Sequence, residues 1–219
     1  MLKRVLFIGD SITDTSRIHE NPTDMGRGYP LLIKAYLGLD YPDMEFINRG
    51  INGNRIVDLY ARIKKDIINL KPDMLSVFIG INDVWHDIDW DNGVETEKFI
   101  KIYEMFLDEI FAALPEIKIM LISPFVLEGK QTANRETDEE RFFKFRRGTD
   151  EKIDAVKSIA KKYNLPLIDL QAEFDKRCKN ISPLHFSLDG IHPTPEGHEL
   201  IKRVWLDAYN LNDKQEKTL

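Results

Sequence analysis

Five short apolar runs, separated by segments with helical spacing, constrain the fold of this chain most strongly. The runs predict strands at residues 4–8, 45–48, 74–79, 118–122 and 166–169. Apolar residues at i, i+3/i+4 and i+7 predict helices over residues 56–67, 99–110 and 153–163. Thr194 is expected to cap a last helix that begins at Pro195. Strands that alternate with helices favour a parallel sheet covered on both faces. We therefore expect one three-layer α/β/α domain over residues 1–219, with a five-stranded parallel sheet.

The composition excludes several classes of protein. A net charge of −6 argues against a nucleic-acid partner and against binding to anionic membranes. No apolar run approaches the ~20 residues that a membrane span requires, and the first residues do not have the pattern of a secretory leader. We therefore expect a cytoplasmic protein. A single cysteine, Cys178, excludes an intrachain disulfide and a cysteine-rich zinc site.

Two segments do not follow the alternation of strands and helices. Residues 14–28 are polar and predict a loop next to Ser11. Residues 128–148 are densely charged but contain three phenylalanines. This second segment is interpreted as a plain loop leading into a helix, as a lid, or as a contact in a homo-oligomer.

Polar residues and glycines follow the first three predicted strands. The three segments are Gly9-Asp10-Ser11, Asn48-Arg49-Gly50-Ile51-Asn52-Gly53-Asn54 and Gly80-Ile81-Asn82-Asp83. Because the carboxyl ends of parallel strands share one edge of a sheet, we expect Ser11, Gly53 and Asn82 to converge. Acyl transfer needs such a set, namely a nucleophile, an unobstructed backbone N–H and a side-chain amide donor. With the N–H of Ser11, these donors would hold a developing oxyanion.

Asp189 and His192 supply the acid and base that a serine nucleophile needs. Two residues separate them, and one is Gly190, so a tight turn can bring the carboxylate to Nδ1 of the imidazole. The other histidines lack this arrangement, and His198 is expected to pack within the last helix. Each of these elements alone is typical of an ordinary turn or cap. Their joint placement favours a serine hydrolase.

The four segments together resemble the SGNH/GDSL hydrolases. Gly9-Asp10-Ser11, Gly53, Gly80-x-Asn82-Asp83 and Asp189-x-x-His192 follow the order of that family and span nearly the whole chain. The resemblance implies a flavodoxin-like fold, with Ser11 as nucleophile, His192 as base and Asp189 as the residue that orients the base. It also implies an oxyanion hole formed by Ser11, Gly53 and Asn82. Ile12 replaces the leucine of the GDSL motif, a position that does no chemistry.

Two further segments look like bacterial acetylxylan esterases of this superfamily. They are Gly80-Ile-Asn-Asp-Val-Trp85 and Pro124-Phe-x-x-Glu128-Gly129. On this resemblance Trp85 and Trp90 would stack on a sugar ring. Arg55 and Glu128 would bind its hydroxyls, and Asp10 is a further candidate contact. The alternative for these residues is local packing and solvent-exposed charge.

We therefore expect an esterase that removes O-acetyl groups from xylo-oligosaccharides or related sugars, without a metal or an organic cofactor. A lysophospholipase or thioesterase that acts on longer acyl chains is one alternative. A non-catalytic binding module on the same fold is another. A metal-dependent phosphoesterase is the third, with ligands drawn from Asp10, Asp14, Asp83, Asp189 and His192.

Overall fold

The computed structural model describes residues 4–133 and 138–216, with side chains through residue 210. Its strands are β1 (Arg4–Gly9), β2 (Glu45–Gly50), β3 (Met74–Phe78), β4 (Lys118–Ile122) and β5 (Leu167–Ile168). All pair in parallel in one five-stranded sheet, in the order β2-β1-β3-β4-β5. The predicted parallel sheet is confirmed, and this order is that of flavodoxin-like folds.

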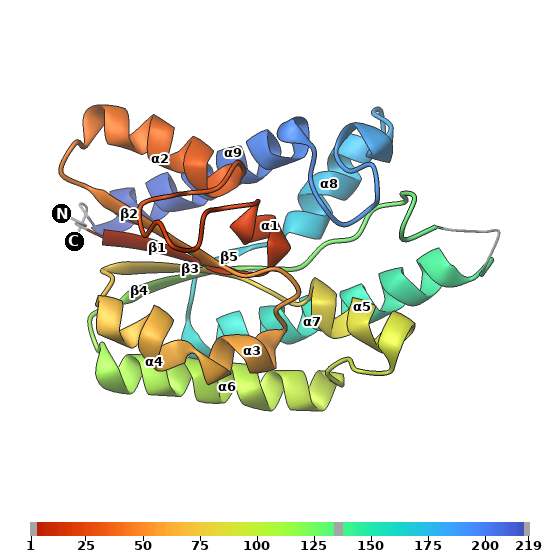
Figure 1. Ribbon diagram of the computed structural model, residues 1–219, viewed down its shortest axis with the longest axis horizontal. Coiled ribbons are helices and arrows are strands. Elements are labelled where there is room, and N and C mark those ends of the chain that lie inside the picture. Colours follow the sequence, from red (N-terminus) through yellow and green to blue (C-terminus); the bar gives the residue numbers. More distant parts are fainter. Residues whose placement is uncertain (1–3, 134–137, 217–219) are drawn as a thin grey trace.

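Helices cover both faces of the sheet (Figure 1). On one face lie α2 (Tyr29–Asp40), α8 (Leu170–Cys178) and α9 (Pro195–Glu216). On the other lie α3 (Ile56–Ala61), α4 (Ile63–Asp66), α6 (Thr96–Ala113) and α7 (Arg141–Tyr163). The remaining elements are α1 (Ser11–Asp14), α5 (Ile81–Trp90) and the 3₁₀ turns η1 (Ile68–Leu70) and η2 (Pro183–His185).

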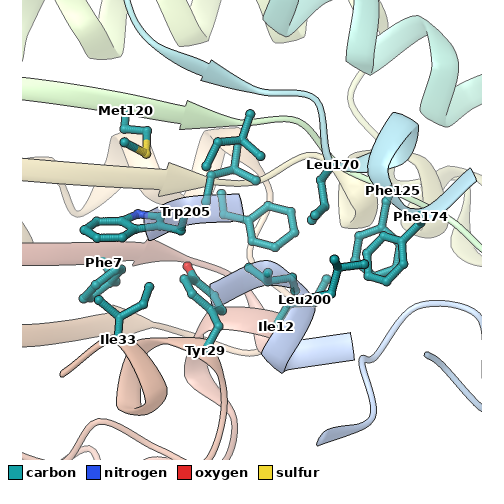
Figure 2. Packing of buried hydrophobic residues seen from close by; sticks show 14 of the residues in the cluster. Phe7, Ile12, Tyr29, Ile33, Met120, Phe125, Leu170, Phe174, Leu200 and Trp205 are labelled. Atoms are coloured by element: carbon teal, nitrogen blue, oxygen red, sulfur yellow. The ribbon is translucent and has the colours of Figure 1, made fainter. Parts of the chain in front are cut away.

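Strand β1 shows why both faces are apolar. Val5 and Phe7 pack into the core beneath α2 and α9, whereas Leu6 and Ile8 pack into the core beneath α3 and α6. Successive side chains of a strand point to opposite faces, so a doubly covered strand must be apolar throughout. In the first core, Phe7 lies beside Trp205 of α9, with ring centroids 5.7 Å apart (Figure 2).

Two predicted helices differ from the observed ones. The helix expected over residues 56–67 is divided into α3, α4 and η1. Arg62 leaves helical geometry at the first break, and its guanidinium donates to the carbonyls of Arg49 and Gly9 at 2.8 and 3.2 Å. Helix α7 begins at Arg141, earlier than predicted, because buried Phe145 adds a turn that packs into the core.

The two irregular segments have different outcomes. Beyond α1, residues 15–28 contain no regular helix or strand, in agreement with the predicted loop. The last part of segment 128–148 is the first part of α7, and residues 134–137 lie outside the described residues. Residues 1–3, at the terminus considered for a leader, are also outside them. Thr194 accepts the N–H of Gly197 at 3.2 Å, so the predicted cap of α9 is confirmed. Across the described ranges, no helix is both long and apolar enough to span a membrane.

Candidate active site

Loops at the carboxyl ends of β1, β2 and β3 open onto one cavity of about 550 Å³. Ser11 follows β1, Gly53 lies shortly after β2, and Asn82 is at the start of α5, which follows β3. The segment between α8 and α9 brings His192 to the same cavity. The structure therefore brings Ser11, Gly53 and Asn82 together, as expected for strands that end at one edge, and His192 joins them from a loop between two helices.

Ser11, His192 and Asp189 form a continuous chain of hydrogen bonds. Ser11 Oγ lies 2.9 Å from His192 Nε2, and His192 Nδ1 lies 2.6 Å from Asp189 Oδ2. A carboxylate can only accept, so Nδ1 carries the ring proton and leaves Nε2 free to accept from the serine hydroxyl. This arrangement can take a proton from Ser11 as the oxygen attacks a carbonyl carbon.

The turn that carries Asp189 is built around its carboxylate. Oδ1 accepts the backbone N–H groups of Ile191 and His192, both at 2.8 Å. The hydroxyl of Ser187 lies 3.0 Å from the same oxygen. Burial alone would raise the pKa of Asp189, but His192 and the two N–H groups hold that pKa well below its usual range. The hydrogen bond to Asp189 in turn raises the pKa of His192 above 6.5.

The loop after β2 presents Gly53 to the cavity. Gly53 has φ +76°, and a Cβ built there would meet nothing within 4 Å. The Asn82 amide donates to the carbonyl of Asn54 at 3.1 Å, which leaves its second N–H for another acceptor. The side chain of the adjacent Asp83 accepts the N–H of Ile56 at 3.1 Å through Oδ1. Two neighbouring side chains therefore hold the Gly53 loop against α5.

Two buried carboxyls lie close to this edge of the sheet. Asp10 is fully buried, and its Oδ1 accepts the N–H of Ile12 at 2.9 Å, which caps α1. Burial raises the pKa of Asp10 to about 7, because desolvation disfavours its charged form. Burial likewise raises the pKa of Asp83 to about 8. Asp10 does not line the cavity, so its position does not favour the expected contact with substrate.

Aromatic rings form one wall of the cavity. Trp85 and Trp90 both line it, with ring centroids 6.0 Å apart. Trp85 also meets the ring of His192 edge-on at 6.1 Å. Trp90 is 60% exposed, and its ring contacts that of His86 with centroids 4.9 Å apart. Both predicted aromatic residues therefore line the same cavity as Ser11 and His192.

The other two predicted sugar contacts are placed elsewhere. Arg55 donates to Asp58 and to the carbonyl of Asn92, and it does not line the cavity. Glu128 is exposed and also lies outside the cavity wall. The sequence alone does not show that Asp58 and Asn92 would be the partners of the Arg55 side chain.

His198 is a cavity residue that sequence reasoning assigned only to packing. It lies on α9, and its Nδ1 accepts the N–H of Tyr29 at 3.2 Å. Burial and the nearby His192 lower the pKa of His198 to about 4, so its ring is neutral at pH 7. Ser187, which supports Asp189, was also missed. No spacing pattern marks either role in the sequence.

A metal-dependent phosphoesterase would need a cluster of side chains that can bind the ion. Within the ranges that the structure describes, no three histidine, cysteine, aspartate or glutamate side chains form a group that could hold a metal ion.

Comparisons with known proteins give concordant matches. Residues 7–200 match the GDSL-like lipase/acylhydrolase family. An acetylxylan esterase from Geobacillus stearothermophilus is 35% identical over 212 residues, which cover 93% of this chain and 92% of that protein. A crystal structure of an acetylxylan esterase from the same organism has a TM-score of 0.81 at 32% identity, and the match covers 94% of this chain and 93% of that one.

Other solved structures agree. An α/β hydrolase from the metagenome of Lake Arreo, Spain, has a TM-score of 0.81 at 30% identity, with 94% of both chains covered. Further structures of the Geobacillus esterase are described as catalytic mutants, in which a serine, an aspartate or a histidine is replaced by alanine.

Proposed function

Because this chain belongs to the GDSL-like lipase/acylhydrolase family, we propose that it removes acetyl groups from xylo-oligosaccharides through an acetyl-Ser11 intermediate. The chain is a carboxylic ester hydrolase with the α/β fold of its acetylxylan esterase relatives. The observation that carries the proposed mechanism is the hydrogen-bonded series Ser11–His192–Asp189, which opens onto the cavity that Gly53 and Asn82 line.

In the first half-reaction, His192 Nε2 takes the proton of Ser11 as Oγ attacks the ester carbonyl carbon. The carbonyl oxygen becomes an oxyanion, which the N–H groups of Ser11 and Gly53 and the second amide N–H of Asn82 would bind. The bond to the leaving oxygen then breaks, and protonated His192 gives its proton to the departing sugar alkoxide. Asp189 stabilises the imidazolium throughout.

In the second half-reaction, water replaces the sugar. His192 takes a proton from the water as its oxygen attacks the acetyl carbon, and the new oxyanion occupies the same donors. Collapse breaks the bond to Ser11 Oγ and releases acetic acid, which ionises to acetate in solution, while His192 gives its proton to Ser11 Oγ. Each step uses only groups of this chain and the two substrates.

A sugar as the leaving group is supported by the aromatic wall and by the relatives. Trp85 and Trp90 border the cavity, and sugar rings stack on such faces. The Geobacillus relative, an acetylxylan esterase, matches over 93% of this chain.

The experiment that tests the proposal is a panel of esters. We expect release of acetate from acetylated xylo-oligosaccharides and from aryl acetates, with little turnover of esters that have long acyl chains. Ser11→Ala should lose this activity but keep the melting temperature of the wild-type protein. A preference for long acyl chains would contradict the sugar deacetylase and favour a lysophospholipase or thioesterase. Full activity of Ser11→Ala would contradict the mechanism.

A further inference from the structure

Two loops interlock beside the active-site cavity. The segment after β4, residues 124–133, runs next to the loop between α8 and α9 (Figure 1). Within these loops, the N–H groups of Leu127 and Lys130 donate to the carbonyls of Gly190 and Leu188 at 2.9 and 3.0 Å. Gln131 donates its N–H to the carbonyl of Asp189 at 2.9 Å. The position of the Asp189–His192 turn therefore depends on the neighbouring segment.

Arg141, at the start of α7, connects that segment to α5. Its Nε donates to the carbonyl of Gln131 at 2.7 Å. Its two terminal nitrogens lie 2.7 and 3.0 Å from the two carboxylate oxygens of Asp89. The side chains of Arg141 and Asp89 are only 12% and 19% exposed. A planar guanidinium that meets a carboxylate with two nitrogens has little freedom to turn.

Asp89 in turn holds Trp85. The indole N–H of Trp85 donates to Asp89 Oδ2 at 2.6 Å, and Gln131 Nε2 reaches the same oxygen at 3.3 Å. Burial would raise the pKa of Asp89, but Arg141 and Trp85 lower it, so this carboxyl stays ionised. Its charge keeps both hydrogen bonds strong.

Arg141 is thus connected, through hydrogen-bonded neighbours, to residues on two sides of the cavity. On one side it reaches Trp85 through Asp89, and on the other it reaches the His192 turn through Gln131. Trp85 and His192 are in ring contact at 6.1 Å. Their separation sets the space beside Ser11, where the alcohol part of an ester must lie.

We propose that Arg141 is a positioning residue that sets the spacing between Trp85 and His192 and so selects for bulky, sugar-like alcohol groups. The inference rests on the proposed function, because it concerns the same cavity. Arg141 does not itself line that cavity, so its effect is transmitted through Asp89 and Gln131. A displacement of about 1 Å in the residues that border the cavity is enough to disturb the productive position of a bound substrate.

A merely structural role would look different. Arg141 also lies over the ring of Phe145 at 5.1 Å, and removing it could simply weaken the start of α7. Such a defect would lower the amount of folded enzyme and reduce activity on every substrate by the same factor. A positioning role instead changes the ratio between substrates that differ only in the alcohol.

The experiment compares Arg141→Met and Arg141→Lys with a control, Arg146→Met. Arg146 lies on the same helix and makes a two-armed ion pair with Asp175 at 3.1 and 3.0 Å, but it does not line the cavity. Kinetics are measured with an acetylated methyl xyloside and with 4-nitrophenyl acetate. For Arg141→Met we expect KM for the xyloside to rise about tenfold, with kcat changed less than about threefold and little effect on the aryl ester.

Arg141→Lys keeps the positive charge but cannot contact both oxygens of Asp89 with two nitrogens in one plane. We expect it to retain part of the selectivity that Arg141→Met loses. Arg146→Met should keep the wild-type ratio. Should Arg141→Met fail to fold, Asp89→Asn provides the same comparison, since it removes the ion pair and keeps an oxygen for Trp85. The inference is wrong if folded Arg141→Met, or folded Asp89→Asn in its place, keeps the wild-type ratio of the two kcat/KM values. A wild-type protein that hydrolyses neither acetate contradicts the proposed function instead.

Discussion

His192 Nδ1 lies 2.6 Å from Oδ2 of Asp189, while Oδ1 of the same carboxylate accepts two backbone N–H groups from its own turn. The Asp189 carboxylate therefore both stabilises the turn and orients the imidazole ring of His192 on that turn. Because all of these groups lie within four consecutive residues, the orientation of the ring relative to its own turn is set locally, whereas segment 124–133 holds the turn itself in place.

Replacing Asp189 with asparagine should change both the rate and its pH dependence. We expect kcat to fall by ~10⁴, because the amide can leave the proton on the wrong ring nitrogen. Activity requires neutral His192, so kcat/KM rises as pH rises through the pKa of that histidine. Asp189 raises this pKa. In Asp189→Asn the rise should therefore occur at lower pH. Rate profiles between about pH 5 and 9 measure the shift. Exposed Asp43→Asn is the control, and an unmoved profile in Asp189→Asn would contradict the assignment.

Asn82→Ala should mainly reduce kcat. Loss of one oxyanion donor typically costs ~10²–10³ in rate, with KM little affected. The variant also loses the hydrogen bond to Asn54, so its free energy of unfolding should fall by about 1 kcal/mol. Steady-state kinetics and thermal unfolding measure the two effects. Asn69→Ala, at an exposed position on η1, is the matched control. A loss in kcat of less than about threefold would remove Asn82 from the oxyanion hole.

Two glycines with positive φ should respond differently to alanine. Gly53 has open space at the Cβ position, so Gly53→Ala bears only backbone strain, about 1–2 kcal/mol. We expect a folded protein that has lost activity, because the relaxed loop moves the Gly53 N–H. At Gly190 a Cβ would collide with the side chain of Thr132 and the carbonyl of Leu127, so Gly190→Ala should be much less stable. Thermal unfolding and steady-state kinetics distinguish the two variants. Equal losses of stability in Gly53→Ala and Gly190→Ala would contradict this prediction.

Two buried carboxyls with raised pKa values, Asp10 and Asp83, should lower stability as pH rises from about 4 to 8, and Asp10 should account for part of this effect. Burial raises its pKa from 3.8, the ordinary value that an unfolded chain would keep, to about 7, so the folded state holds the proton over this range. The stabilisation is full below about pH 4 and is lost as pH rises to 7, a change on the order of 4 kcal/mol. We expect Asp10→Asn to flatten the pH dependence of the free energy of unfolding. Asp43→Asn should keep the wild-type slope, and an equally steep slope in Asp10→Asn would refute the assignment.

The sheet, the meeting of Ser11, Gly53 and Asn82, and the pairing of Asp189 with His192 could be predicted because they depend on short-range patterns. Apolar runs mark buried strands, and parallel strands place their carboxyl ends together. The strand order came from the family resemblance, since hydrophobic periodicity does not specify which strands are neighbours.

The rest depends on tertiary contacts that periodicity does not record. Arg62 interrupts a regular helical pattern because its side chain finds carbonyl acceptors on β1 and β2. Asp10 is adjacent to the predicted nucleophile, yet it points into the interior and caps α1. Arg55 likewise donates to Asp58 and to the carbonyl of Asn92, outside the cavity, and these contacts depend on the tertiary structure. The roles of Gln131 and Arg141 require a knowledge of which loops are neighbours.

The interlocked loops have a consequence for how this chain can change. A side chain at Gly129 would meet the backbone of Asp189 and Gly190, and one at Gly190 would meet Thr132. Neither loop can therefore accept a larger residue there unless the other moves. The two segments are far apart in sequence, but each fixes the position of the other. Substitutions accumulated by descendants of this protein should appear in both loops together, and grafting one loop from a distant relative should succeed only when its partner is transferred with it.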